Sequence, residues 1–308
     1  VLFRSKDRIA SVIVGQEQTV DLVLTAILAN GHVLIEGVPG VAKTLLARLT
    51  ARLIDADFSR VQFTPDLMPS DVLGTTVFNM KTNGFDFHQG PIFADIVLVD
   101  EINRAPAKTQ AALFEVMEER QISIDGTTHR MGDLYTILAT QNPVEQEGTY
   151  KLPEAQLDRF LMKITMDYPS LEEEVNILER HHTNAALVKL DDITPAITKE
   201  ELLSLRAFMN QVFVDRTLLQ YIALIVQQTR TSKAVYLGAS PRASVAMLQS
   251  SKAYALLQGR DFVTPEDIKF VAPYVLQHRL ILTAEAEMEG YSPVKVTQRL
   301  IDKVEVPK

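Results

Sequence analysis

The residues best suited to chemistry lie in the stretch GVPGVAKT, residues 37–44, between the apolar run HVLIE and the helix-like run KTLLARLTARLI. A glycine-containing turn between a strand and a helix presents backbone N–H groups at a helix N-terminus, where they attract phosphate oxygens. Lys43 would reach the outer phosphates of a nucleotide, and the hydroxyl of Thr44 would hold Mg²⁺. This stretch therefore predicts a nucleotide-binding loop.

One position in this loop departs from the common pattern G-x-x-x-x-G-K-[ST], because Ala42 stands where a glycine is usual. The added methyl group is tolerated if the residue keeps a negative φ and is costly if the backbone must be left-handed. On the residues alone, an ordinary turn between a strand and a helix stays open as the alternative.

Two adjacent acids follow the apolar run IVLV, residues 96–99. A buried strand of this kind presents Asp100 and Glu101 at its carboxyl end, where ligands bind in open α/β sheets. Asp100 would bind Mg²⁺ directly or through water, and Glu101 would orient and activate the attacking water as a general base. Acidic strand ends are common, but this one accompanies a phosphate loop, and the pair favours phosphate chemistry.

Three further polar residues complete a possible site. Asn142 ends a predicted strand and would position water near the γ-phosphate, Arg159 precedes the last predicted strand, and Arg242 begins a helix in the second half of the chain. Each arginine taken alone is more often a surface charge. As an ordered series they match the parts of a phosphoryl-transfer site.

The elements that must position these residues alternate in the first half of the chain, which predicts an α/β domain with a parallel sheet. Strands are expected at 32–36, 58–64, 95–100, 134–140 and 160–166, and helices at 43–54 and 106–120. Asp125-Gly126 lies between alternating residues, so a β-hairpin is expected over 121–132.

After Pro169 the β-rich runs stop and helical patterns continue. Ser240 is expected to cap one of these helices, and Thr264 with Asp267 forms the pattern of a capping box. We therefore expect two domains, an αβα nucleotide-binding core with its linker over residues 1–190 and a smaller all-helical domain over residues 191–308.

Composition limits the compartment and the partners. The 308 residues are 46% hydrophobic and 23% charged, include no Cys, and carry a net charge of −8. The absence of Cys excludes disulfides and thiolate metal sites and fits a reducing compartment, so we expect a cytoplasmic protein. No apolar run is long enough for a membrane span, residues 1–10 lack a signal-peptide pattern, and the acidic balance makes nucleic-acid binding an unfavoured function.

The chain resembles an AAA+ ATPase, and specifically the MoxR family, over almost its whole length. The strings that carry this resemblance are VGQE (14–17), GVPGVAKT (37–44), HQGPIFADIVLVDEINRAPAKTQAALFEVMEERQ (88–121), ATQNPVEQEGTYKLPEAQLDRF (139–160) and LGASPRA (237–243). The string DEINRAP within them is far more specific than a phosphate loop. MoxR-like loops often carry Ala at the position of Ala42, so the resemblance indicates an intact loop.

The resemblance implies a role for each matching residue. Lys43 and Thr44 correspond to the Walker A pair, and Asp100 and Glu101 to the Walker B pair. The other positions that it places at the nucleotide are Val14 and Gly15 near the adenine, and Gly37, Val38, Pro39, Gly40, Val41, Ala42 and Leu45 around the phosphates.

Three more roles follow from the same resemblance. Asn142 corresponds to sensor 1, Arg159 to an arginine finger that reaches the nucleotide of a neighbouring subunit, and Arg242 to sensor 2, which couples a helical lid to the γ-phosphate. A finger supplied by a neighbour requires head-to-tail subunits, which form closed rings. The family implies a homo-oligomer, with a hexamer as the expected ring.

The resemblance implies ATP and Mg²⁺ as cofactors and ATP hydrolysis as the reaction. It further implies chaperone-like remodelling or maturation of a protein client, with metal-cofactor insertion as one form and a von Willebrand factor A domain protein as the partner. The segment 64–93 and the hairpin at 121–132 are candidates for client contact.

Other functions stay open at this point. A small P-loop kinase or GTPase is disfavoured because no Asn is followed by Lys, as guanine recognition would need. A nucleic-acid motor or loader is disfavoured because residues 64–93 contain Lys81 and no Arg, against Asp66, Asp71 and Asp86. A nucleotide-dependent scaffold without turnover, or a motor subunit like that of magnesium chelatase, remains the alternative.

Overall fold

The computed structural model describes residues 15–143, 149–182 and 193–307 of the 308-residue chain. It forms two compact units, each assembled from separate stretches. The first unit comprises Val1–Glu17, His32–Leu152 and Thr165–Leu203, and the second comprises Gln18–Gly31, Pro153–Ile164 and Ser204–Lys308. The expected division at residue 190 is continuous along the chain whereas these units interleave, so that domain boundary stays a prediction.

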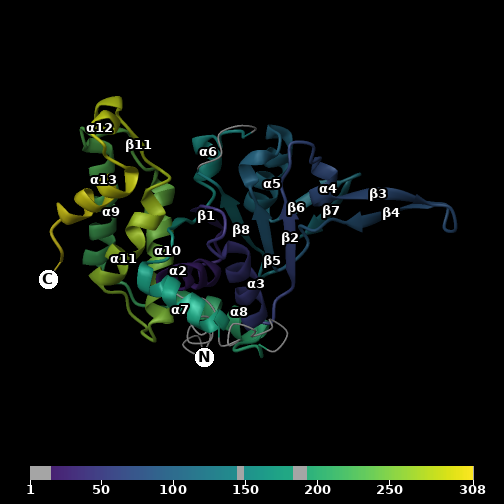
Figure 1. Cartoon of the computed structure of the whole chain (residues 1–308), viewed down its shortest axis with the longest axis horizontal. Helices are drawn as coiled ribbons and strands as arrows, with labels where there is room; N and C mark the ends of the chain where they lie inside the picture. Colours follow the sequence, from purple (N-terminus) through teal and green to yellow (C-terminus); the bar gives the residue numbers. More distant parts are fainter. Residues whose placement is uncertain (1–14, 144–148, 183–192, 308) are drawn as a thin grey trace. The chain divides into compact units, whose positions relative to one another are not determined.

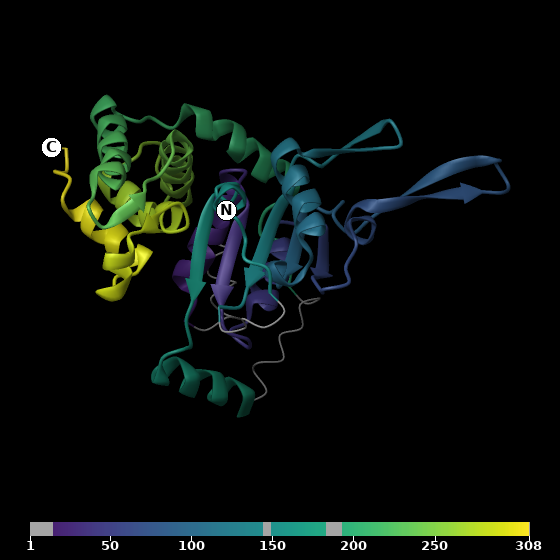
Figure 2. The same cartoon turned by 90° about the horizontal axis from the view of Figure 1, so that it is seen from above.

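A five-stranded parallel sheet is the central element of residues 33–166 (Figure 1). Its strands, in spatial order, are β2 (Phe58–Gln62), β5 (Ile96–Asp100), β8 (Thr136–Gln141), β1 (Val33–Gly37) and β9 (Met162–Met166). Figure 2 shows these strands side by side. The apolar run of β5 is completely buried, as expected for a strand covered on both faces of a parallel sheet. The predicted parallel sheet is confirmed.

The register of this sheet brings the ends of its strands to one edge. β5 pairs with β2 so that Asp100 lies opposite Gln62, and β5 pairs with β8 so that Val99 lies opposite Ala139. β8 also pairs with β1, with Glu36 opposite Gln141. The loops that follow β1, β5 and β8 therefore leave the sheet at the same edge.

Helices lie between these strands and after the last of them. They are α3 (Lys43–Leu53), α4 (Pro69–Leu73), η1 (Ile102–Arg104), α5 (Ala107–Glu119), α7 (Leu171–His182) and α8 (Lys199–Phe208). α3 packs against β2 and β5 through an apolar face that includes Leu46, Leu49 and Leu53. Full burial of each such leucine contributes about 1.5–3 kcal/mol.

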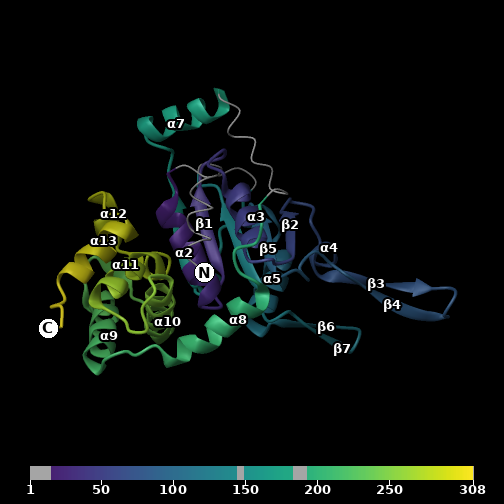
Figure 3. The ribbon, with the colours of Figure 1, turned by 90° about the horizontal axis from the view of Figure 1, so that it is seen from below.

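Two antiparallel hairpins extend from the first unit. β3 (Gly74–Asn79) pairs with β4 (Gly84–Gln89) in a long hairpin (Figure 1), and β6 (Gln121–Ile124) pairs with β7 (Thr127–Arg130) in a shorter one (Figure 3). The second hairpin is the one expected from Asp125-Gly126, and both turn residues have positive φ, 50° and 78°. These angles are what a two-residue hairpin turn requires.

The second unit is helical. Its helices are α2 (Glu17–Leu28), α6 (Glu154–Leu157), η3 (Met209–Gln211), α9 (Arg216–Thr231), α10 (Pro241–Leu257), α11 (Pro265–Leu276), α12 (Ala284–Met288) and α13 (Pro293–Asp302). A two-stranded ribbon of β10 (Val235–Leu237) and β11 (Ile281–Leu282) interrupts them. α9 buries Leu218, Tyr221, Ile222 and Ile225, the i, i+3, i+4, i+7 spacing of one helix face.

Helix starts in this unit follow the sequence signals in part. Thr264 and Asp267 form the expected capping box at α11. Ser240 is the N-cap residue of α10, as expected, but its side chain makes no capping hydrogen bond. The Ser240 hydroxyl instead donates to Asp158 at 3.5 Å. No helix among the described residues is long and apolar enough to traverse a bilayer.

Candidate active site

The loop between β1 and α3 has the backbone shape of an anion-binding site. Gly40 has a φ of 90° and Ala42 a φ of 63°, so two residues of the loop are left-handed. Ala42 is also the N-cap residue of α3, and no side chain caps this helix end. Left-handed turns of this kind turn successive N–H groups toward a common concavity, and the helix N-terminus adds positive potential. The loop is thus built to accept phosphate oxygens.

Ala42 adopts the costly one of the two conformations considered from the sequence. A left-handed conformation costs a residue with a Cβ about 1–2 kcal/mol. The methyl group is nonetheless accommodated, and the chain proceeds directly into α3. Gly37, by contrast, has no room for a side chain, since an added Cβ would lie 2.8 Å from the carbonyl oxygen of Met166.

Lys43 lies over the loop that precedes it. Its ammonium donates a hydrogen bond to the carbonyl oxygen of Gly37 at 2.5 Å. This contact holds a positive charge at the concave side of residues 37–43, where the outer phosphates of a nucleotide would be bound.

Asp100 is held from two sides at the carboxyl end of β5. Its Oδ1 accepts a hydrogen bond from Thr140 Oγ1 at 2.6 Å. Its Oδ2 accepts hydrogen bonds from Arg60 Nη2 at 2.7 Å and Nε at 3.2 Å. Both oxygens are therefore oriented, and the side chain is only 13% exposed. The neighbouring Arg60 is 48% exposed, so solvent screens much of this ion pair.

Thr140, on β8, connects Asp100 with Glu101. The same hydroxyl that donates to Asp100 accepts a hydrogen bond from the backbone N–H of Glu101 at 2.9 Å. Glu101 has a φ of 57°, so its backbone is left-handed at the point where the chain leaves β5. The buried hydroxyl therefore fixes an unusual backbone conformation at a residue predicted to be catalytic.

The carboxylate of Glu101 is oriented by two donors. Its Oε2 accepts a hydrogen bond from Gln62 Nε2 at 2.7 Å and forms an ion pair with Arg104 Nε at 3.2 Å. Gln62 Oε1 in turn accepts from Arg60 Nη2 at 3.1 Å. Asp100, Arg60, Gln62 and Glu101 thus form one continuous polar network along the edge strand β2.

The sequence analysis did not single out the residues that orient the two acids: Arg60, Gln62, Arg104 and Thr140. Arg60 and Gln62 carry a weak signal, because they alternate with Val61 in a β-rich run and so share one face. Thr140 carries no such signal in the sequence, because its contact with Asp100 depends on the pairing of β5 with β8.

Most of the predicted site residues line one pocket of about 460 Å³ in the first unit. The residues that line it are Pro39, Gly40, Ala42, Lys43, Thr44, Leu45, Asp100, Glu101 and Asn142. Asn142 is itself 6% exposed and follows β8. The structure therefore brings the phosphate loop, the two acids and the polar residue after β8 together around a single space.

Other predicted residues lie elsewhere. Gly15, Gly37, Val38 and Val41 do not line the pocket, although Gly37 and Val41 belong to its loop. Arg159 and Arg242 belong to the second unit, and Val14 lies outside the described residues.

The residues present fit a nucleotide with Mg²⁺ better than a metal alone. Within residues 15–143, 149–182 and 193–307 no group of three or more His, Cys, Asp or Glu side chains could hold a metal ion. Thr44 and Asp100 both line the pocket and carry side-chain oxygens. Mg²⁺ characteristically takes one or two protein oxygens and completes its shell with phosphate oxygens and water. The donor set and the uncapped N-terminus of α3 therefore suit such a pair.

Comparisons with known proteins agree with this site. Residues 32–162 match the family model of the ATPase family associated with various cellular activities (AAA), and residues 227–302 match that of the AAA lid domain. The chain is 44% identical over 316 residues to Chaperone MoxR1 of Mycobacterium tuberculosis, covering 100% of this chain and 82% of that protein. The chain belongs to the MoxR family of AAA ATPases.

Two further comparisons extend this assignment. Protein MoxR of Methylorubrum extorquens is 30% identical over 308 residues, which cover 92% of this chain and 89% of that protein. A crystal structure of a candidate ATPase from Cytophaga hutchinsonii superposes with a TM-score of 0.90 at 41% identity, covering 99% of this chain and 94% of that one. This MoxR-family protein is an ATPase, with an AAA core followed by a helical lid.

Proposed function

We propose that this protein hydrolyses MgATP in the pocket between the loop at 37–44 and the acids at 100–101, and that an oligomeric ring uses the energy to remodel protein clients. The observation that carries the proposal is the convergence of Lys43, Asp100 and Glu101 on one pocket. Similarity to Chaperone MoxR1 over the whole chain supports a chaperone-like role.

Each pocket residue has a task in this reaction. Backbone N–H groups of the loop and the Lys43 ammonium bind phosphate oxygens, and Thr44 and Asp100 would hold Mg²⁺. When bound, Mg²⁺ neutralises charge that develops on the phosphates. Asn142 orients the attacking water beside the γ-phosphate. These residues position and stabilise, which is the larger part of phosphoryl-transfer catalysis.

Glu101 takes the proton from that water. Both of its donors, Gln62 and Arg104, contact Oε2. This leaves Oε1 to accept a proton while Oε2 stays anchored. The left-handed backbone of Glu101 and the Thr140 hydroxyl that accepts from its N–H support the same orientation of this side chain.

Further parts of the proposal rest on family resemblance. Arg159 would act on the nucleotide of a neighbouring subunit, and Arg242 on the nucleotide of its own subunit. The ring would be a hexamer, the partner a von Willebrand factor A domain protein, and the work remodelling or metal-cofactor insertion. A cytoplasmic location also stays a prediction.

The test is the Mg-ATPase rate per subunit as a function of protein concentration. We expect a rate that rises with concentration, because Arg159 completes the site only across an interface. Lys43→Ala and Glu101→Gln should each lower the rate by about 100-fold or more, whereas Lys108→Ala, on the exposed side of α5, should stay within about twofold. A rate that is clearly above background and independent of concentration would refute the ring mechanism, and a rate at background throughout would refute hydrolysis of MgATP in this pocket.

A further inference from the structure

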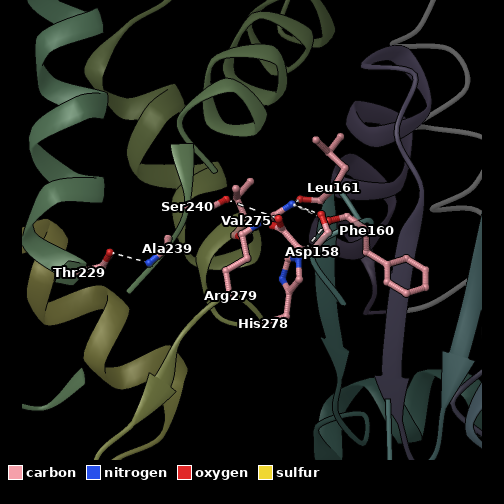
Figure 4. Close-up of polar contacts among 9 residues, drawn as sticks. All are labelled: Asp158, Phe160, Leu161, Thr229, Ala239, Ser240, Val275, His278 and Arg279. Carbon is pink, nitrogen blue, oxygen red and sulfur yellow. Dashed lines mark hydrogen bonds and ion pairs between the residues drawn. The ribbon is translucent and has the colours of Figure 1, made fainter. Parts of the chain in front are cut away.

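Arg279, which follows α11, uses most of its guanidinium N–H groups to hold one short segment of the second unit. Its Nε donates to Asp158 Oδ1 at 2.6 Å, and Nη2 donates to the carbonyl oxygens of Asp158 at 3.1 Å and Phe160 at 2.8 Å. Nη1 donates to the carbonyl oxygen of Leu161 at 3.2 Å and to that of Val275. Figure 4 shows Arg279 between Val275 on one side and Asp158, Phe160 and Leu161 on the other.

These five hydrogen bonds use all five N–H groups that a guanidinium possesses. The Arg279 side chain is only 4% exposed, so its charge is compensated inside the unit rather than by solvent. A single rigid, planar group therefore fixes residues 158–161 against the end of α11.

Asp158 has a second contact, on its other oxygen. Ser240 Oγ donates to Asp158 Oδ2 at 3.5 Å, from the N-cap position of α10. This explains why Ser240 does not cap its own helix. Asp158 thus joins two points of the second unit, the end of α11 and the start of α10.

The start of α10 is itself fixed on α9. Ala239 N donates to Thr229 Oγ1 at 3.0 Å, and Arg230 Nε donates to the carbonyl oxygen of Ala239 at 2.9 Å. Gly238 is so close that an added Cβ would lie 2.8 Å from the Thr229 carbonyl oxygen. Figure 4 shows Thr229, Ala239 and Ser240 along this path. A displacement of this turn is therefore passed on rather than absorbed.

The two arginines assigned to the nucleotide lie next to this cluster in the chain. Arg159 directly follows Asp158, and Arg242 lies two residues after Ser240. Burial lowers the pKa of Arg279, Asp158 opposes that effect, and the charge of Arg242 lowers it further. Arg242 lies in the first turn of α10, the helix whose N-cap residue is Ser240.

We propose that Asp158 is a positioning residue that couples Arg242 to Arg159, with Arg279 as its anchor and Ser240 as the link to α10. This inference rests on the proposed function, in which Arg242 responds to the subunit's own nucleotide and Arg159 acts on the neighbour's. A shift at the start of α10 would be transmitted through Ser240 and Asp158 to the backbone that carries Arg159. Occupancy of one site would then set catalysis at the next.

The experiment reports motion and catalysis separately. Because the chain contains no Cys, Ala155→Cys on the exposed side of α6 gives a single site for an environment-sensitive fluorophore. The labelled parent, Asp158→Asn and Ser240→Ala are titrated with Mg²⁺ and the non-hydrolysable analogue AMP-PNP, and binding is measured independently with a fluorescent nucleotide. Unlabelled proteins supply kcat, KM and the Hill coefficient for ATP.

Matched controls come from the same unit. Asp267→Asn removes the charge from another Asp–Arg pair, Asp267–Arg260, in which the aspartate is buried and the closest contact is 2.5 Å. Ser292→Ala removes a serine at the N-cap of α13, where its hydroxyl accepts from Lys295 N. Neither control residue contacts the cluster of Asp158, Ser240 and Arg279.

We expect the parent to respond to AMP-PNP, and Asp158→Asn and Ser240→Ala to bind it within about twofold of the parent affinity without the fluorescence response. Asp158→Asn should lower kcat by about 10- to 100-fold, as misplacement of a catalytic group does, with KM within about twofold and a Hill coefficient near one. The two controls should keep both the response and the cooperativity.

Three results would overturn the inference. The first is a parent-like response and kcat in Asp158→Asn and Ser240→Ala, and the second is an equal loss in the controls, which would indicate general destabilisation. The third is a parent that binds AMP-PNP without any fluorescence change, which leaves the proposed function intact. A parent that binds no nucleotide would instead overturn the proposed function, and the inference with it.

Discussion

Replacement of Thr140 by valine tests how the two acids of the site are held. The change keeps the size and the branched shape of the side chain and removes one hydroxyl. Thr140 is 1% exposed, so water cannot take the place of that hydroxyl. Thr140→Ser is the matched control, because it keeps the hydroxyl and loses a methyl group.

The magnitude follows from two hydrogen bonds. The bond from Thr140 Oγ1 to the Asp100 carboxylate is 2.6 Å long, and a bond to a charged group contributes about 1.5–3 kcal/mol. The bond from Glu101 N is 2.9 Å long and contributes about 0.5–1.5 kcal/mol. Since Asp100 keeps its contact with Arg60, we expect Thr140→Val to lower the free energy of unfolding by about 2–4 kcal/mol. Thr140→Ser should cost only about 1 kcal/mol for the lost methyl group.

Thr140→Val should lower the catalytic rate as well as the free energy of unfolding. Without the hydroxyl, nothing on β8 holds the Glu101 N–H, and the left-handed backbone of Glu101 loses its support. We expect Thr140→Val to lower the kcat for ATP by about 10- to 100-fold, and Thr140→Ser to stay within about threefold of the parent. The assays are urea unfolding followed by circular dichroism and steady-state phosphate release, at a temperature where both variants are folded.

The comparison of Thr140→Val with Thr140→Ser tests whether the hydroxyl orients the two acids. If Thr140→Val is as stable and as active as Thr140→Ser, the hydroxyl does not orient Asp100 and Glu101, and the account of the polar network is wrong. If Thr140→Val loses stability but keeps kcat, the hydroxyl is structural only.

Three further predictions concern the loop, the network and the second unit. Ala42→Gly relieves about 1–2 kcal/mol of left-handed strain but raises the entropy of the unfolded chain, which costs about 0.4–1 kcal/mol. A net gain in the free energy of unfolding of up to about 1.6 kcal/mol is therefore expected in urea unfolding, and a loss would contradict the strain. Gln62→Leu removes a donor to Glu101 and should change kcat with ATP affinity within about twofold, as judged by nucleotide titration; an unchanged kcat would exclude a role for Gln62. Burial and the charge of Arg279 lower the pKa of His278 well below its ordinary value. The unfolded state therefore takes up a proton near pH 6.5 that the folded state does not bind. The free energy of unfolding should fall below that pH by up to about 1.4 kcal/mol per pH unit. His278→Gln, which can still donate to the Phe160 carbonyl, should remove this pH dependence of the free energy of unfolding between pH 7 and 5. An unchanged slope would show that another group causes the pH dependence.

The sequence predicted the parts of the site that are local in the chain. The β5 run and its two acids, the loop at 37–44 and the turn at Asp125-Gly126 each carry their signal within a few residues. Their spacing and residue types are enough to predict what they form. The pocket that joins the loop, the acids and Asn142 follows from one topological rule, that parallel strands end at one edge.

The parts that escaped prediction depend on distant pairing. Thr140 meets Asp100 across 40 positions because β8 lies beside β5, and Gln62 meets Glu101 because β2 lies on the other side. Strand order is not written in any local pattern. The positive φ of Ala42 is likewise imposed by the connection from β1 to α3, against the preference of alanine itself.

The positive-φ residues outside glycine have an uneven distribution in the described chain. Asn30, Asp55, Asn83 and Asp125 are of the types that tolerate this conformation, whereas Ala42, Glu101 and Arg120 are not. Arg120 is the C-cap residue of α5, and Ala42 and Glu101 both line the pocket. The left-handed backbone at Ala42 and at Glu101 therefore strains the loop after β1 and the turn after β5 by about 1–2 kcal/mol each. Local opening should begin there before it reaches the sheet, so the amide hydrogens of residues 38 and 40–42 should exchange faster than those of β1, and their exchange should slow when an anion occupies the loop. Part of the binding free energy of any ligand in this pocket is therefore used to keep these two turns in their left-handed conformations.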